Sequence, residues 1–270
     1  MKGIPMQDMV KLIRQLSYRH RTHKVFSDFV EMSAIALSNA TDKAHFEPRE
    51  DRYLEIVKNY NQEELNEFSN LLGLLVNHLE ERPQDILGDV FHALELHNEL
   101  KGQFFTPFPI GRMMSKMTIG KRHQDIINQF DFINVSEPAC GTGAMIIAIA
   151  EELKEQGFNY QQSMHVTAVD LDITCVHAAF VQFSLLHIPA VVVHGNTITL
   201  EEFSHWYTPA HQLGFWNTKL SQKSKALNLQ KIVSSADIGN AQQSDKSVND
   251  STHLNTDENI APIALQLKLF

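Results

Sequence analysis

Two glycines and a carboxylate occupy positions where a chain could bind a nucleotide-like ligand. Gly141 and Gly143 lie between a short apolar run, residues 132–135, and a strongly helical segment, residues 144–153. Glycines at such a turn lack Cβ atoms, so the backbone can turn sharply and a ligand can approach its amides. A second apolar run ends in Asp170, where doubly wound folds hydrogen-bond a ribose. A glycine turn of this kind occurs in many nucleotide-binding folds and also in some ordinary turns. The carboxylate that follows it favours the nucleotide-binding fold.

The carboxylates also have a purely structural interpretation. Glu137 could stabilise a helix start, and Asp170 or Asp172 could cap the helix expected over residues 173–186. The residues alone leave both interpretations open.

Three segments, in order, resemble the adenine-N6 DNA methyltransferases, especially the modification subunits of type I restriction systems. Residues 137–143 read Glu-Pro-Ala-Cys-Gly-Thr-Gly and match the family's cofactor motif at every position. Residues 102–107 read Gly-Gln-Phe-Phe-Thr-Pro, like the segment that precedes this motif, with Ile110 and Met113-Met114 after it. Residues 193–198 are similar to the family's Gly-Asp/Asn-Thr-Leu at the end of the third strand. The resemblance covers roughly residues 85–200, including the helix expected at residues 85–91.

The resemblance implies S-adenosylmethionine (SAM) as the cofactor and methyl transfer to adenine N6 in duplex DNA. Glu137 would accept hydrogen bonds from the methionine ammonium group, Asp170 would bind the ribose hydroxyls, and Asn196 would read the adenine edge. Residues 105–107 would form a lid, and Cys140 would be a small buried residue and not a nucleophile. The predicted cofactor-binding residues are Phe105, Thr106, Pro107, Glu137, Pro138, Ala139, Cys140, Gly141, Gly143, Asp170 and Asn196.

A catalytic motif of the family is missing. Amino-methylating enzymes of this kind carry Asp/Asn-Pro-Pro-Tyr/Phe after the fourth strand, and this chain contains no Pro-Pro. The motif holds a flipped base against an aromatic ring and accepts hydrogen bonds from its amine, whose lone pair is delocalised. Residues 207–210 and 214–217 are the next candidates, but they lack the diproline turn and follow no apolar strand. The catalytic residues are therefore unknown, and we do not expect the chain to methylate DNA unaided.

The expected fold class is α/β, a Rossmann-like SAM-dependent methyltransferase fold with only the cofactor-binding half of the sheet. Strands are predicted at residues 132–136, 165–170 and 190–194. The first strand would then form an apolar edge that needs a cover. The candidate covers are the amino-terminal helices, residues 200–230 folding back, or a partner protein that supplies Asn-Pro-Pro-Phe.

Composition divides the chain of 270 residues into four parts. Helical periodicity predicts a helical domain over residues 1–100, followed by the methyltransferase-like domain over residues 101–232. Residues 233–262 are rich in Ser, Asn, Gln and Asp and are predicted to be a disordered linker. Residues 263–270 are apolar again and form a separate carboxyl-terminal peptide.

Charge and residue counts limit the partners. The net charge of −9 argues against a protein that binds DNA with its whole surface, although basic clusters at residues 11–24 and 121–123 could contact phosphates or be solvated helix faces. Two cysteines, no apolar run near twenty residues and no secretory signal predict a cytoplasmic protein without a membrane span. The 14 histidines show no ligand spacing with cysteines or carboxylates, so no metal site is predicted.

The carboxyl-terminal peptide resembles a known ligand motif. Residues 266–270 read Gln-Leu-Lys-Leu-Phe, like the Gln-Leu-Ser/Asp-Leu-Phe peptide with which bacterial replication and repair proteins bind the sliding clamp. Its apolar side chains could fill a groove while the glutamine forms amide hydrogen bonds. Lys268 departs from the usual Ser or Asp, and a tail packed on its own domain is the alternative. The predicted partner-binding residues are Gln266, Leu267, Leu269 and Phe270.

Two functions remain. The first is a SAM-dependent DNA adenine-N6 methyltransferase or a subunit of one, with DNA and a second methylase or specificity subunit as candidate partners. The second is a non-catalytic SAM-binding protein of a mobile element, which would regulate or decoy a host modification system and bind the replication clamp through its tail.

Overall fold

The computed structural model describes residues 6–96, 106–228 and 267–268 of the chain. Residues 6–214 and 267–268 belong to one compact unit. The described part of a second unit, residues 215–228, is helical from residue 216 onward, with the Lys219 ammonium 4.4 Å from the centroid of the Trp216 ring. The boundary predicted at residue 100 and the whole of the predicted linker lie outside the described residues.

The amino-terminal region is helical, as its periodicity predicts. Helices α1, α2, α4 and α5 each bury several apolar residues, whereas α3 buries Arg49 and Ile56. Helix α4 begins with a capping box in which Asn61 and Glu64 satisfy each other's backbone amides. None of the helices in the described part of the chain is long and apolar enough to cross a membrane. The elements are α1 (Gln7–Leu16), α2 (Thr22–Asn39), the 3-10 turn η1 (Lys43–His45), α3 (Phe46–Val57), α4 (Gln62–Glu81) and α5 (Ile86–Ala93).

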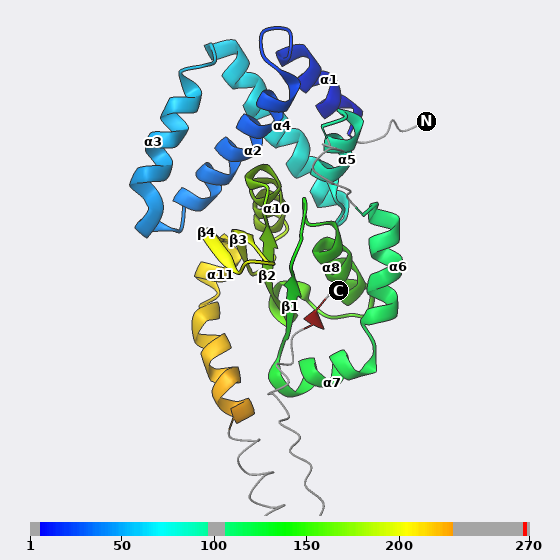
Figure 1. Cartoon of the computed structure of the whole chain (residues 1–270). Helices are drawn as coiled ribbons and strands as arrows, with labels where there is room; N and C mark the ends of the chain where they lie inside the picture. The colour runs from blue at the N-terminus through cyan, green and yellow to red at the C-terminus, as the bar shows by residue number, and fades with distance from the viewer. Residues whose placement is uncertain (1–5, 97–105, 229–266, 269–270) are drawn as a thin grey trace, which may run out of the picture. The chain divides into compact units, whose positions relative to one another are not determined.

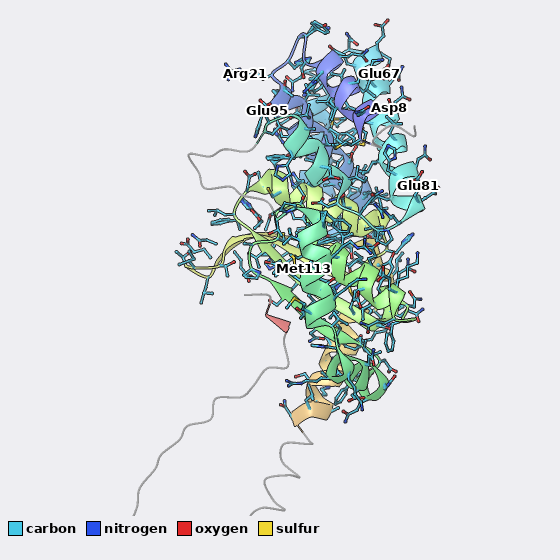
Figure 2. The ribbon with its side chains drawn as sticks, turned by 90° about the vertical axis from the view of Figure 1, so that its right-hand side faces the viewer. Asp8, Arg21, Glu67, Glu81, Glu95 and Met113 are labelled. Carbon is cyan, nitrogen blue, oxygen red and sulfur yellow. The ribbon has the colours of Figure 1, made fainter. Side chains whose placement is uncertain are left out.

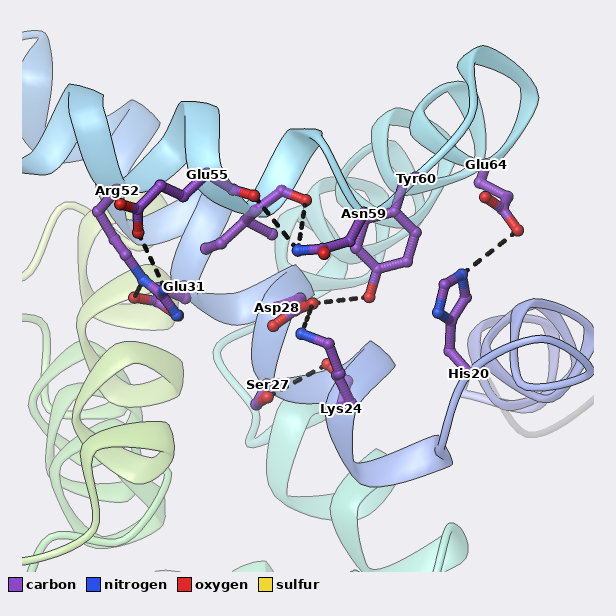
Figure 3. Close-up of polar contacts among 11 residues, drawn as sticks. His20, Lys24, Ser27, Asp28, Glu31, Arg52, Glu55, Asn59, Tyr60 and Glu64 are labelled. Carbon is purple, nitrogen blue, oxygen red and sulfur yellow. Dashed lines mark hydrogen bonds and ion pairs between the residues drawn. The ribbon is translucent and has the colours of Figure 1, made fainter.

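Part of the amino-terminal basic cluster is neutralised by the fold itself (Figure 3). Lys24 donates to the buried carboxylate of Asp28 at 2.7 Å, and the Tyr60 hydroxyl donates to the same oxygen at 2.7 Å. His20 and Arg19 lie 3.5 Å and 3.3 Å from the Glu64 carboxylate. These contacts join α2 to the segment between α3 and α4, and the segment before α2 to α4 itself, so the paired side chains have a structural role within the helical region.

The remaining elements build an α/β layer arrangement (Figure 1). Strands β1, β2 and β3 are parallel, and helices α8 and α10 connect them. Helix α2 packs along α10, and α6 packs along α8, so the helical region and the sheet share one core. The elements are α6 (Phe108–Thr118), α7 (Lys121–Phe130), β1 (Ile133–Glu137), α8 (Ala144–Glu155), α9 (Tyr160–Ser163), β2 (Met164–Asp170), α10 (Ile173–Leu185), β3 (Ala190–Asn196), β4 (Glu201–Tyr207), α11 (Pro209–Leu213) and β5 (Leu267–Lys268).

The sheet is wider than the sequence predicts. Its order is β4-β3-β2-β1-β5, with β4 antiparallel to β3. The three predicted strands are confirmed within a few residues, but β4 was missed. Most side chains of β4 are exposed or half-buried, and Trp206 is its buried residue, so β4 shows no apolar run. Residues 207–210 therefore lie at the end of a strand, but this strand is not apolar, as the sequence predicts.

Two residues of the carboxyl-terminal peptide, those of β5, pair with the outer edge of β1. Val135 is paired with Leu267 and Ser136 with Lys268, in parallel. None of the three predicted covers is the one found at this edge. Residues 201–207 do fold back, but they pair with β3 on the opposite side of the sheet.

Arg49 of α3 ties the helical region to β4. Its guanidinium carbon lies 4.0 Å from the centroid of the Trp206 ring, and its Nη2 donates to the carbonyl of His205 at 2.8 Å. Nη1 donates to Asp42 at 2.9 Å and also to Ser38. A buried guanidinium with these partners fixes the edge strand against α3.

Candidate cofactor site

The three predicted polar residues lie at one edge of the sheet. Glu137, Asp170 and Asn196 are the last residues of β1, β2 and β3. Because the three strands are parallel and adjacent, their carboxyl ends meet at the same edge. The structure therefore brings together residues that lie in three separate segments of the sequence.

The glycine turn is tied to the end of β2. Gly141 and Gly143 have φ angles of 53° and 104°, in the left-handed region that favours glycine. The Gly141 amide donates to Asp170 Oδ2 at 2.8 Å, and the Cys140 amide donates to the Val169 carbonyl at 2.8 Å. A Cβ at Gly143 would lie 2.5 Å from Phe183 Cε1, so packing also requires glycine there.

Asp170 and Asp172 have different roles: Asp172 caps a helix and Asp170 holds the glycine turn. Asp172 accepts from the Thr174 amide at 2.8 Å and caps α10, which confirms one structural interpretation. Asp170 does not cap the helix; its Oδ1 accepts from the Asp172 amide at 2.9 Å and its Oδ2 holds the glycine turn. Burial raises the pKa of Asp170, and the backbone amides oppose that rise. Asp170 is therefore the carboxylate placed at the turn.

Glu137 is a largely buried carboxyl group beside the same turn. Its side chain accepts from the Ala139 amide at 3.2 Å. Burial raises the pKa of Glu137 to about 7, and the negative charge of Asp170 adds to the rise. A cationic ligand group would favour the ionised form and reverse this shift.

Asn196 uses its carbonyl oxygen within its own loop. Oδ1 accepts from the amides of Ile198 and Thr199 at 3.0 Å and 3.3 Å. The Thr197 hydroxyl donates to the Pro138 carbonyl at 2.6 Å and joins this loop to the glycine turn. The NH₂ group of Asn196 is thus the part of its side chain left for a ligand.

The predicted lid is described only in part. Thr106 and Pro107 are exposed, and Pro107 is the N-cap of α6, whereas Phe105 lies outside the described residues. Helix α6 also exposes Ile110, Met113 and Met117, and Met113 is labelled in Figure 2. A lid role for residues 105–107 stays a prediction.

Cys140 is buried within the motif. Burial raises the pKa of its thiol well above the usual value, and the surrounding carboxylates act in the same direction. A reactive thiolate requires the opposite surroundings. Across the described residues, no group of three His, Cys, Asp or Glu side chains is arranged to hold a metal ion.

Sequence reasoning missed the residues behind the turn. The Thr142 hydroxyl donates to Asp85 Oδ2 at 2.8 Å, and Gln182 Nε2 donates to Asp85 Oδ1 at 2.8 Å. All three side chains are buried. Thr142 lies inside the recognised motif, and Asp85 begins α5, but no sequence pattern indicates that the two meet.

The first candidate for a catalytic loop lies at the wrong edge. Because β4 is antiparallel, Tyr207 pairs with Val191 near the start of β3. Thr208 is buried there, where it caps α11 and its Oγ1 accepts from the Ala190 amide at 2.9 Å. Residues 207–210 are therefore at the amino ends of the parallel strands, opposite Glu137 and Asp170.

A family comparison agrees with the motif assignment. The family described as N-6 DNA methylase matches residues 82–252. A crystal structure from Listeria monocytogenes, assigned to the class I S-adenosylmethionine-dependent methyltransferases, aligns with a TM-score of 0.39 and 14% identity. That alignment covers 72% of this chain and 54% of the other, so this chain spans about half of that protein's length. No curated protein sequence matches the chain.

Proposed function

Because the chain belongs to the N-6 DNA methylase family, for which SAM is the implied cofactor, we propose that it is the SAM-binding component of a DNA adenine-N6 methyltransferase. The observation that carries this proposal is the convergence of Glu137, Asp170 and Asn196 on one glycine turn. Each comes from the end of a different parallel strand, at the edge where open α/β sheets bind ligands.

The donors and acceptors at this edge fit the chemistry of SAM. Glu137 would hold the methionine ammonium group, and Asp170 would accept from the ribose hydroxyls. The Asn196 NH₂ group would donate to an adenine nitrogen, since its oxygen is engaged by the loop. SAM supplies the electrophilic methyl group, and these residues bind and orient it.

We infer that methyl transfer needs residues that residues 1–270 do not supply. Within the described residues, the loop after β4 lies at the opposite edge from the cofactor residues. The chain also lacks the Pro-Pro turn that positions a flipped adenine. A type I modification complex, with DNA and a second methylase or specificity subunit, would provide this arrangement.

Calorimetric titration of the purified chain with SAM tests the proposed site. We expect micromolar binding by the parent chain and none by Gly141→Asp, in which a charged side chain would occupy the turn at a position with positive φ. A folded parent chain that does not bind SAM would overturn the proposal.

Transfer of labelled methyl groups tests the missing catalytic half. We expect the chain alone to leave adenine-containing duplex DNA unlabelled even when saturated with SAM. Labelling of adenine N6 by the chain alone would show that its own residues complete the catalytic site.

We propose a second role for the carboxyl-terminal peptide, as a ligand for a sliding clamp. The supporting observation is that Leu267 and Lys268 already adopt β-strand conformation, which suits a peptide bound in a groove. Clamp binding through Gln266, Leu267, Leu269 and Phe270 would require release from β1. The test is binding of the full chain to purified clamp. We expect the double variant Leu267→Ala/Leu269→Ala to abolish this binding. Equal binding by the variant and the parent would refute the role.

A further inference from the structure

A buried polar network joins the helical region to the back of the glycine turn. Asp85 caps α5 by accepting from the Gly88 amide at 3.0 Å, and it accepts from the Thr142 hydroxyl at 2.8 Å. Thr142 lies between Gly141 and Gly143, the residues whose positive φ angles shape the turn. A residue of the helical region is therefore bonded directly to the centre of the cofactor motif.

The network is closed, because each polar side-chain atom in it has a partner. Gln182 Nε2 donates both to Asp85 Oδ1 and to the Thr142 carbonyl, each at 2.8 Å. Gln182 Oε1 accepts from the Leu87 amide at 3.1 Å. Both the side chain and the backbone of Thr142 are thus held, from α5 on one side and from α10 on the other.

Packing gives this network little freedom. The exposed fractions of Asp85, Thr142 and Gln182 are 4%, 1% and 0%. A Cβ at Gly88 would overlap the Asp85 carboxylate and lie 2.6 Å from Thr142 Oγ1. Burial raises the pKa of Asp85, and the hydrogen bonds from Gln182, Thr142 and Gly88 oppose the rise.

We propose that Asp85 is a positioning residue for the cofactor site, which it serves by holding the glycine turn through the Thr142 hydroxyl. The inference rests on the proposed SAM site and extends it to α5. The Thr142 side chain is engaged behind the turn, so it acts on a ligand only through the backbone on either side of it. Loss of this hydrogen bond would let the turn leave the conformation that keeps it beside the ends of β1 and β2.

Substitutions at both ends test the hydrogen bond with little other change. Asp85→Asn keeps the size of the side chain and the helix cap, because asparagine caps as well as aspartate. With its oxygen facing Gly88 and Gln182, its NH₂ group would donate to the Thr142 hydroxyl, so the contact is kept with its direction reversed and the charge removed. Thr142→Val removes the hydroxyl at similar volume, whereas Thr142→Ser retains it.

We expect Thr142→Val to weaken SAM binding about tenfold, the scale of one hydrogen bond, and Asp85→Asn to weaken it less, because the contact persists without its charge. Thr142→Ser should restore binding to within about twofold of the parent, since the donor is present. The matched control is Asp89→Asn, which makes the same charge change on the same helix at an exposed side chain and should bind like the parent. Equal affinity of all four variants, with a parent that binds SAM, would overturn the inference.

Hydrogen exchange without ligand separates this inference from the SAM proposal. The amides of Cys140, Gly141 and Gly143 are hydrogen-bonded, so their exchange reports on the turn. We expect faster exchange in Thr142→Val, at amides distant from α5 in sequence, and parent-like exchange in Thr142→Ser and Asp89→Asn. If the parent does not bind SAM, the proposed function fails and exchange alone decides: unchanged protection of the turn would refute the positioning role.

Discussion

The two sides of the glycine turn are built differently. Behind it, the hydrogen-bonding partners come from α5 and α10, are buried, and satisfy one another. In front of it, the carboxylates of Glu137 and Asp170 and the oxygen of Asn196 accept from nearby backbone amides. The back is fixed by distant parts of the chain, while the front holds groups that a ligand can engage.

This contrast predicts two kinds of mutational effect. A buried polar group that loses its partner destabilises the folded state, because water cannot replace that partner. A half-exposed group at the ligand edge loses mainly ligand affinity when it is removed. Substitutions behind the turn should therefore change the free energy of unfolding as well as SAM affinity, and substitutions in front should change mainly SAM affinity.

The largest effect is expected at Gly143, because both sides of the glycine turn depend on this residue. Gly143→Ala would place a Cβ 2.5 Å from Phe183 Cε1 at a φ of 104°. We expect the free energy of unfolding to fall by about 2 to 5 kcal/mol, measured by urea denaturation, with SAM binding lost. Gly157→Ala is the matched control: its φ is 85° but its Cβ would meet nothing within 4 Å, so only about 1 kcal/mol should be lost. Equal losses for both variants would mean that Phe183 does not constrain the turn.

Gln182→Leu tests the back of the turn alone. It removes the donor to Asp85 and Thr142 and the acceptor for Leu87 without leaving a large cavity. We expect a loss of about 3 kcal/mol in the free energy of unfolding, because three buried groups lose a partner. The control Gln162→Leu changes an exposed residue and should stay within about 0.5 kcal/mol of the parent. A similarly small change for Gln182→Leu would contradict the closed network.

The elements that sequence predicts well are those set by local patterns. The amino-terminal helices follow apolar periodicity, and α10 begins after Asp172, a common N-cap residue. The strand ends at Glu137, Asp170 and Asn196 follow from apolar runs that stop at polar residues. These three strand ends meet at one edge because the strands are parallel, and the order of the motifs in the sequence implies parallel strands.

The elements that were missed depend on contacts far along the chain. Trp206 is buried because Arg49 and α10 cover it, and nothing near β4 in sequence shows that cover. Strand β5 pairs with a strand more than a hundred residues earlier, and Asp85 meets Thr142 across 57 residues. A sequence pattern can indicate that a residue will be buried, but it does not say which distant residue will be its partner.

In front of the turn, Asp170→Ala should reduce affinity more than stability. We expect SAM to bind more weakly by about 1 to 3 kcal/mol, the scale of charge-assisted hydrogen bonds. Asp172→Ala is the control, because it removes the α10 cap and should cost about 1 kcal/mol of folding free energy with little change in affinity. Titration and urea denaturation of both variants check this division. If Asp172→Ala weakened binding as much as Asp170→Ala, the ribose position would have been assigned wrongly.

The smallest effect concerns the protonation of Glu137. Its pKa in the free protein is raised to about 7 by burial and then by Asp170, so at lower pH the carboxyl group is mostly neutral. The SAM ammonium group favours the carboxylate, and binding below this pKa must therefore release a proton. Affinity should rise about tenfold per pH unit below the pKa and level off above it. Calorimetry in buffers of different ionisation enthalpy measures the proton release directly.

Glu137→Gln should bind more weakly above pH 7 and lose most of this pH dependence, with any remainder assigned to Asp170, whose pKa is also raised. A parent chain whose affinity does not change with pH, or a variant that keeps the full slope, would place the ammonium group away from Glu137.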